Sequence, residues 1–185
     1  MSNHKLIDRI TLVHGDITKQ RDVDAIVTTM QTNMDMDSGL NKAIIKAAGE
    51  KLDDFILEHI YKPRIGDVHA LPSFKLEIPF IFAAFTPDWR DGAIREDRDL
   101  IRCYRNAVDL ARRLRLRRIA FPALGMGRQA YPVQRAARLA IQGMQERQTG
   151  SLGEIRIVCN RDDLVKAFAA RLWALGWQGK VRVDE

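Results

Sequence analysis

The sequence predicts an α/β fold built on a largely parallel sheet, and two observations carry that prediction. Short apolar runs alternate with longer segments of helical periodicity along the chain, as in successive strand–helix–strand units. The 185 residues, 46% of them hydrophobic, suffice for one domain with a sizeable core. The chain has no low-complexity tract, internal repeat or long linker, so we expect residues 1–185 to form a single domain.

In the first half of the chain, short apolar runs predict four strands, at residues 10–13, 24–29, 68–71 and 78–85. Residues 24–29 are apolar on both faces, as in a central strand. Apolar residues at helical spacing then predict helices over 40–48 and 52–60. Ser38 is a candidate cap for the first of these helices, and Gly49 is placed to end it.

In the second half, helices and strands alternate, at residues 97–116, 118–124, 132–148, 155–159 and 162–175. The segment 97–116 has a clear apolar helix face. Pro132 suits the first turn of its helix, and Gly176 is placed to end the last one. The regular alternation favours a parallel sheet covered by helices on both sides.

Composition excludes several classes of protein. No apolar run approaches the ~18 residues of a membrane span, because the longest candidate is Ile78 to Phe85. Residues 1–9 lack the apolar core of a secretory signal. Cys103 and Cys159 lie far apart in apolar segments, which indicates buried free thiols. The histidines show no metal-binding spacing. We therefore expect a cytoplasmic protein with no metal and no other cofactor.

The charge balance favours an anionic partner. Lysine and arginine outnumber acidic residues by 30 to 24, a net charge of +6, which suits an anionic ligand or weak contact with nucleic acid. Five arginines fall within seven residues: Arg112, Arg113, Arg115, Arg117 and Arg118. They end a predicted helix, where positive charge offsets the helix dipole. A solvated helix end and an anion-binding patch both fit this pattern.

Three loops after predicted strands have the chemistry of a ligand site, because ligands of open α/β sheets bind at the carboxyl ends of strands. Asp16 follows the first strand and suits either a turn cap or an acceptor for an exocyclic amine. Residues 28–41 lead into a helix start, which favours anions, and Gly39 permits close approach. Residues 125–128 (GMGR) combine glycines with an arginine, as in a phosphate-binding turn or a purely structural one.

Taken together, these segments resemble the macro-domain family from about Ile10 to Trp173. The resemblance rests on an ordered set of motifs: LVHGDIT at 12–18, DAIV at 24–27, LNKAIIKAAG at 40–49, CYRNA at 103–107, IAFPA at 119–123 and GMGRQAYP at 125–132. It implies a three-layer α/β/α fold with a mixed, mostly parallel central sheet. It also implies ADP-ribose or a related nucleotide as the ligand.

The resemblance further implies a role for each matching position. Asp16 would accept a hydrogen bond from the adenine amine, with Ile17 beside it. Gly39 and Leu40 would lie across the ligand from the loop that surrounds the diphosphate and distal ribose, which comprises Gly125, Met126, Gly127, Arg128, Gln129 and Ala130. Asn160 stands where the family often has an aromatic residue against adenine, so that stacking is lost.

The departures from the family pattern concern the catalytic positions. Gln31 stands where an asparagine usually orients the distal ribose, and its extra methylene displaces the amide. Asn41 replaces the aspartate of hydrolytic members, and a neutral amide is no general base. The family's run of glycines is here MDSG, residues 36–39. A replacement acid or base would come from Asp37 or Asp35.

These substitutions separate three hypotheses. The first is a macro domain that binds ADP-ribose, free or on a modified protein, with weak or no hydrolase activity. The second is an active ADP-ribosyl hydrolase or O-acetyl-ADP-ribose deacetylase that uses Asp37 or Asp35. The third is a divergent macro domain that binds another nucleotide or RNA, helped by the arginine-rich segment. None of them involves a membrane.

Overall fold

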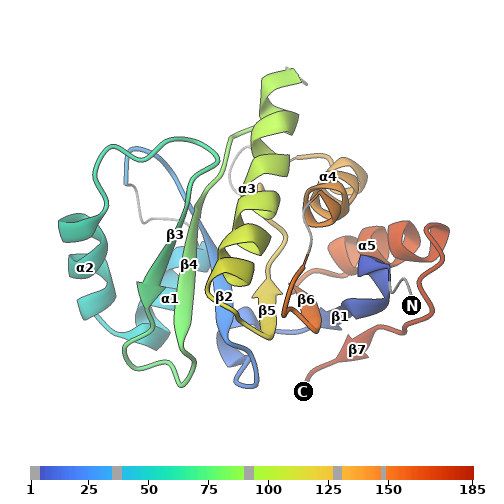
Figure 1. Ribbon diagram of the computed structural model, residues 1–185, viewed down its shortest axis with the longest axis horizontal. Helices are drawn as coiled ribbons and strands as arrows, with labels where there is room; N and C mark the ends of the chain where they lie inside the picture. The colour runs from blue at the N-terminus through green and yellow to red at the C-terminus, as the bar shows by residue number, and fades with distance from the viewer. Residues whose placement is uncertain (1–4, 35–38, 90–93, 127–130, 147–148) are drawn as a thin grey trace.

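The computed structural model describes residues 5–34, 39–89, 94–126, 131–146 and 149–185 (Figure 1). Several positions singled out in the sequence lie outside these ranges: Asp35, Asp37, Ser38, Gly127, Arg128, Gln129 and Ala130. The described chain forms a seven-stranded sheet with strand order β3-β4-β2-β5-β6-β1-β7. The strands are β1 (Ile10–His14), β2 (Ala25–Met30), β3 (Val68–Pro72), β4 (Phe80–Phe85), β5 (Arg118–Phe121), β6 (Glu154–Cys159) and β7 (Arg182–Val183).

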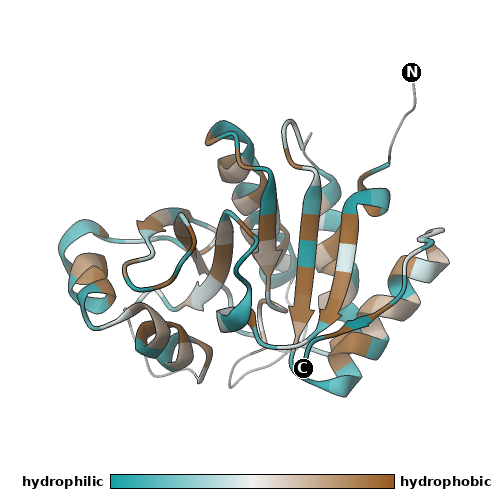
Figure 2. Ribbon diagram, turned by 90° about the horizontal axis from the view of Figure 1, so that it is seen from below, coloured by the Kyte–Doolittle hydropathy of each residue, from teal (hydrophilic) through white to brown (hydrophobic). Residues whose placement is uncertain are grey.

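The sheet is mixed and mostly parallel, as the sequence predicts. Strand β3 pairs antiparallel with β4, and the other neighbouring strands pair in parallel. The carboxyl ends of β1, β2, β5 and β6 therefore meet at one edge of the sheet. Figure 2 shows hydrophobic residues concentrated along the strands, in keeping with a sheet covered on both faces.

Helices cover both faces of the sheet and complete a three-layer α/β/α arrangement (Figure 1). One face packs against α1 (Gly39–Ala48) and α2 (Lys51–His59). The other packs against α3 (Ile94–Arg113), α4 (Val133–Gln145) and α5 (Asp162–Ala174). Within β2, Ile26 joins the first core, whereas Ala25 and Val27 join the second. This is why the strand is apolar on both faces.

The elements differ from the sequence prediction mainly at their ends. Strand β5 stops at Phe121 because Pro122 follows, and β4 starts at Phe80 directly after Pro79, since proline lacks the N–H that a strand ladder needs. Pro132 lies just before the first residue of α4 rather than within it. Gly49 and Gly176 follow α1 and α5 with φ of 99° and 95°, a left-handed conformation that suits glycine.

Three short elements are not among the predicted helices and strands. Two are 3-10 turns, η1 (Leu6–Arg9) before β1 and η2 (Ile17–Lys19) after it, and the third is the exposed two-residue strand β7, which pairs with the end of β1. Elements of two to four residues are too short to leave a periodic pattern. Within the described ranges, no helix is long and apolar enough to cross a membrane.

Candidate functional site

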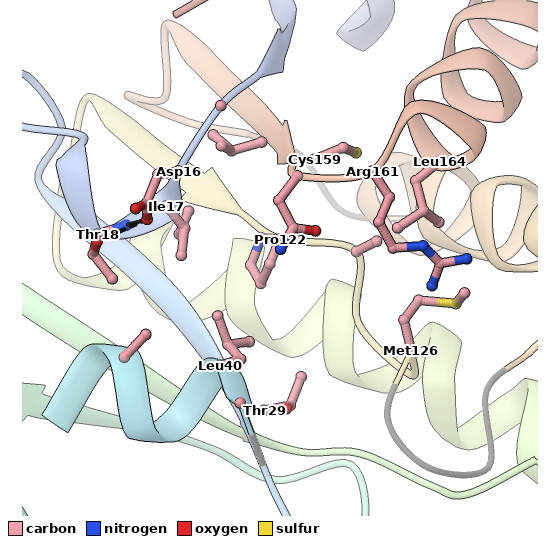
Figure 3. A pocket seen from close by; sticks show the side chains of 16 residues that line it. Asp16, Ile17, Thr18, Thr29, Leu40, Pro122, Met126, Cys159, Arg161 and Leu164 are labelled. Atoms are coloured by element: carbon pink, nitrogen blue, oxygen red, sulfur yellow. Dashed lines mark hydrogen bonds between the residues drawn. The ribbon is translucent and has the colours of Figure 1, made fainter. Parts of the chain in front are cut away.

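A cleft of about 470 Å³ opens at the carboxyl ends of β1, β2, β5 and β6 (Figure 3). Its volume falls in the range of small-molecule sites. Its wall is formed by the loops after β1, β5 and β6, the starts of α1 and α5, and the last residues of β2 and β6. The described lining residues are Gly15, Asp16, Ile17, Thr18, Thr29, Gly39, Leu40, Ala43, Pro122, Ala123, Met126, Val158, Cys159, Asn160, Arg161 and Leu164.

Asp16 lies at one end of the cleft and caps the turn η2. Its Oδ1 accepts hydrogen bonds from the Thr18 backbone N–H at 2.8 Å and from the Thr18 hydroxyl at 2.7 Å. Its Oδ2 accepts no hydrogen bond from the described residues. The side chain of Ile17 is buried beside it. Asp16 therefore caps the turn through one oxygen and keeps the other available to a ligand, so the two roles are compatible.

Gly39 and Leu40 form the opposite side of the cleft, at the start of α1. The first N–H groups of a helix have no intrahelical partner, and they carry the positive end of the helix dipole. A Cβ atom added at Gly39 would meet no other atom within 4 Å, so protein packing does not require glycine there. This side of the cleft offers backbone donors to an anion.

Asn41 and Gln31, at the positions to which the macro-domain resemblance assigns catalysis, differ in burial. Asn41 is buried, with 4% of its surface exposed, and its Oδ1 accepts a hydrogen bond from the hydroxyl of Thr28 in β2. Gln31 is exposed directly after β2. Neither is among the described residues that line the cleft. The side chain of Asn41 is thus turned into the protein, where it joins α1 to the sheet.

The turn after β5 brings Met126 to the cleft. Gly125 precedes it with φ of 82°, and a Cβ atom there would lie 3.0 Å from the Tyr131 ring. Both the backbone angle and the close ring therefore favour glycine. The turn is anchored from below, because the Leu124 N–H donates to the Tyr104 hydroxyl at 2.7 Å and the Tyr131 N–H donates to the Gly125 carbonyl at 3.2 Å.

The end of β6 contributes a neutral thiol and two polar side chains. Both cysteines are buried and free, as the sequence predicts. Burial raises the pKa of the Cys159 thiol to about 12, so at neutral pH it is protonated and is no nucleophile. Asn160 and Arg161 are exposed and line the cleft.

Arg161 is the residue of chemical interest that sequence reasoning did not identify. It follows Asn160 after the predicted strand 155–159, at a strand end of the kind that supplied the other site residues. The same rule, that ligands bind beyond the carboxyl ends of strands, would have selected it. Thr29, Pro122 and Leu164 also line the cleft, but small and apolar residues leave no comparable signal.

Comparisons of sequence with known proteins agree with this architecture. A family model described as "Macro domain" matches residues 27–140. A macro domain-containing protein of Methanosarcina mazei is 33% identical over 168 residues, which cover 90% of this chain and 89% of that protein. A macro domain-containing protein of Cupriavidus necator is 31% identical over 170 residues, covering 89% of this chain and 98% of the relative.

Solved structures with the same fold include nucleotide complexes. The Oceanobacillus iheyensis macrodomain with ADP superposes with a TM-score of 0.82 at 28% identity, covering 91% of this chain and 93% of that one. A mutant of the same macrodomain with ADPR has a TM-score of 0.78 at 26% identity, covering 89% and 91%. The chain is therefore similar in sequence and in fold to macrodomains that hold nucleotides.

Proposed function

Because this chain belongs to the macro-domain family, we propose that it binds ADP-ribose or a related nucleotide diphosphate, with weak or no hydrolase activity. The carrying observation is the cleft of about 470 Å³ at the carboxyl ends of four strands. Its described lining holds a single carboxylate at one end and helix-start amides on one side. The similar macrodomains with ADP and ADPR support the choice of ligand.

The adenine base lies at the Asp16 end of the cleft in this proposal. The unoccupied Oδ2 of Asp16 accepts a hydrogen bond from the exocyclic amine. Ile17, Pro122 and Val158 supply apolar surface to the base, and burial of that surface favours binding. A carboxylate accepts but does not donate, so this end selects a base that carries an amine.

The diphosphate lies between the start of α1 and the turn after β5. Gly39 and Leu40 present backbone N–H groups to it, as helix starts commonly do for phosphates. Met126 lines the other side, where Gly125, with φ of 82°, turns the chain before it. The remaining contacts in the proposal belong to Gln31, at the distal ribose, to Asn160, and to the rest of the loop: Gly127, Arg128, Gln129 and Ala130.

Weak or absent hydrolysis follows from the groups that the cleft offers. Asn41 carries a neutral amide and is buried against Thr28, so it does not act as a general base. Asp16 is the only carboxylate among the described lining residues, and it lies at the adenine end. The alternative is an active hydrolase, which requires Asp37 or Asp35 as the replacement base.

Calorimetric titration with ADP-ribose tests the binding proposal. We expect saturable heat, and no heat at high micromolar protein contradicts the proposal. Release of ADP-ribose from a modified protein is then followed with an active macrodomain hydrolase as the positive control. We expect release near background. Release at the rate of the control enzyme that is lost in Asp37→Ala or Asp35→Ala supports the hydrolase instead.

A further inference from the structure

Arg161 is the only basic side chain among the described residues that line the cleft. It lies after Asn160 in the connection between β6 and α5, just before the first residue of α5, in an extended conformation with φ −126° and ψ 137°. Figure 3 shows its guanidinium beside Leu164, reaching toward Met126 and away from Asp16. The cation thus lies toward the proposed phosphate region rather than at the adenine end.

The Arg161 guanidinium is held in place but remains accessible. It pairs side-on with Asp163, Nε donating to Oδ1 at 3.1 Å and Nη2 donating to Oδ2. The backbone N–H of Leu164 donates to the same Asp163 Oδ1 at 2.9 Å, so the carboxylate is anchored to the start of α5. The side chains of Arg161 and Asp163 are 47% and 50% exposed.

The ion pair leaves most of the donors of Arg161 available. A guanidinium has about five N–H donors, and the two bonds to Asp163 use two of them. The terminal Nη1 donates to no described residue. A planar guanidinium fixed by a carboxylate on one edge presents its other edge in the geometry that suits a phosphate.

We propose that Arg161 is a specificity-determining residue that binds the phosphate oxygens of the ligand and makes the cleft select nucleotides over nucleosides. This inference rests on the proposed function and deepens it. A diphosphate brings two negative charges into the cleft. Apart from Arg161, the described lining offers only the amides at the start of α1 to balance them. The negative charge of Asp163 offsets part of the positive charge of Arg161, and this limits the affinity for a phosphate.

The test compares ligands with and without phosphate. Dissociation constants for ADP-ribose and ADP are measured by calorimetry, and that for adenosine by NMR titration, in wild type and Arg161→Gln. We expect the substitution to raise the dissociation constants of ADP-ribose and ADP about tenfold, as for loss of a charge-assisted hydrogen bond. The dissociation constant of adenosine should change less than twofold. Arg161→Lys should fall between, because lysine keeps the charge but not the planar fork.

Two further variants control the result. Arg138→Gln removes the same charge from an exposed arginine of α4 that is not among the described lining residues, and it should bind all three ligands as wild type does. Asp163→Asn keeps an oxygen for the Leu164 N–H but removes the competing charge, so it should bind ADP severalfold more tightly. Thermal melting verifies that each variant is folded.

Three outcomes overturn the assignment to different extents. If Arg161→Gln binds ADP-ribose as wild type does, Arg161 is not a phosphate ligand. If Arg161→Gln loses affinity for adenosine and for ADP by the same factor, the residue acts in the base site or in the fold. If the wild type itself does not bind ADP-ribose, the proposed function fails, and this assignment fails with it.

Discussion

The two ends of the central sheet hold their charges in different ways. At the amino end, the charged side chains have hydrogen-bond and ion-pair partners within the protein. Asp24 accepts hydrogen bonds from the backbone N–H groups of Arg117 and Arg118 at 2.7 and 2.9 Å. Arg156, whose side chain is 2% exposed, pairs with Asp22 at 2.6 Å and with Glu154 at 3.0 Å.

At the carboxyl end, two charged side chains keep hydrogen-bonding atoms that no described residue uses, and both side chains line a cleft. Asp16 uses one carboxylate oxygen to cap a turn, and Arg161 uses one edge of its guanidinium to bind Asp163. Both residues are exposed at the cleft wall. Incomplete pairing beside a cavity, rather than the number of charges, distinguishes the end that suits a ligand.

The arginine-rich segment illustrates this difference. Five arginines in seven residues suggest either a solvated helix end or an anion site, but they lie at the end of α3 and the start of β5, away from the cleft. Arg112 and Arg113 both pair with Asp109, at 2.7 and 3.4 Å. These contacts favour the solvated helix end.

The largest effect should come from the buried arginine. We expect Arg156→Ala to lower the free energy of unfolding by about 3 kcal/mol, because the partly buried Glu154 loses its nearer cation and keeps only Arg118, at 3.7 Å. Arg161→Ala, the matched change at the cleft, should cost less than about 0.5 kcal/mol. Urea unfolding measures both, and similar values for the two variants would remove the distinction between the two ends.

Asp16 should give the next largest effect, on the choice of base. Asp16→Asn retains an oxygen that accepts from the Thr18 N–H, but its amide nitrogen donates where the carboxylate accepted. We expect ADP-ribose to bind about tenfold more weakly, the cost of roughly one charged hydrogen bond. The same substitution should reduce the affinity for the analogue with a hypoxanthine base less, because that base has an oxygen in place of the amine. Calorimetry with both ligands decides, and equal losses would place the base elsewhere.

A smaller effect should appear in the pH dependence of stability. The hydrogen bond from Arg156 lowers the pKa of Asp22 from 3.8 to about 2. A depressed carboxyl pKa stabilises the fold above the unfolded value of 3.8, and this contribution is lost as pH falls through the folded value of about 2. Because Asp22 is 63% exposed, we expect less than about 1 kcal/mol. Urea unfolding should separate Asp22→Asn from wild type more at pH 6 than at pH 2; a constant difference would exclude the linkage.

The smallest expected effect is at the arginine-rich segment. Arg113→Gln should change the affinity for ADP-ribose less than twofold, because Arg113 pairs with Asp109 and is not among the described residues of the cleft. The measurement is calorimetry at low salt, where long-range charge effects are strongest. A tenfold loss of affinity in this variant would favour the anion-binding patch instead of the solvated helix end.

Periodicity predicted the α/β fold, and strand-end chemistry selected Asp16, Gly39 and Met126, which line the cleft. The resemblance to the macro-domain family added three more residues that line it: Ile17, Leu40 and Asn160. Other features depend on tertiary contacts that no local pattern encodes. The inward turn of Asn41 requires Thr28 on a neighbouring strand. The accessibility of Arg161 depends on Asp163 and the start of α5.

An NMR titration of isotope-labelled protein with ADP-ribose tests the central claim most directly, since it reports which end of the sheet binds the ligand. We predict that backbone amide signals shift at Gly15, Thr18, Leu40 and Leu164, around the cleft, while those of Arg117, Arg118 and Gly153 at the amino end stay unchanged. Shifts confined to the amino end, or no shifts at saturating ligand, would contradict the account.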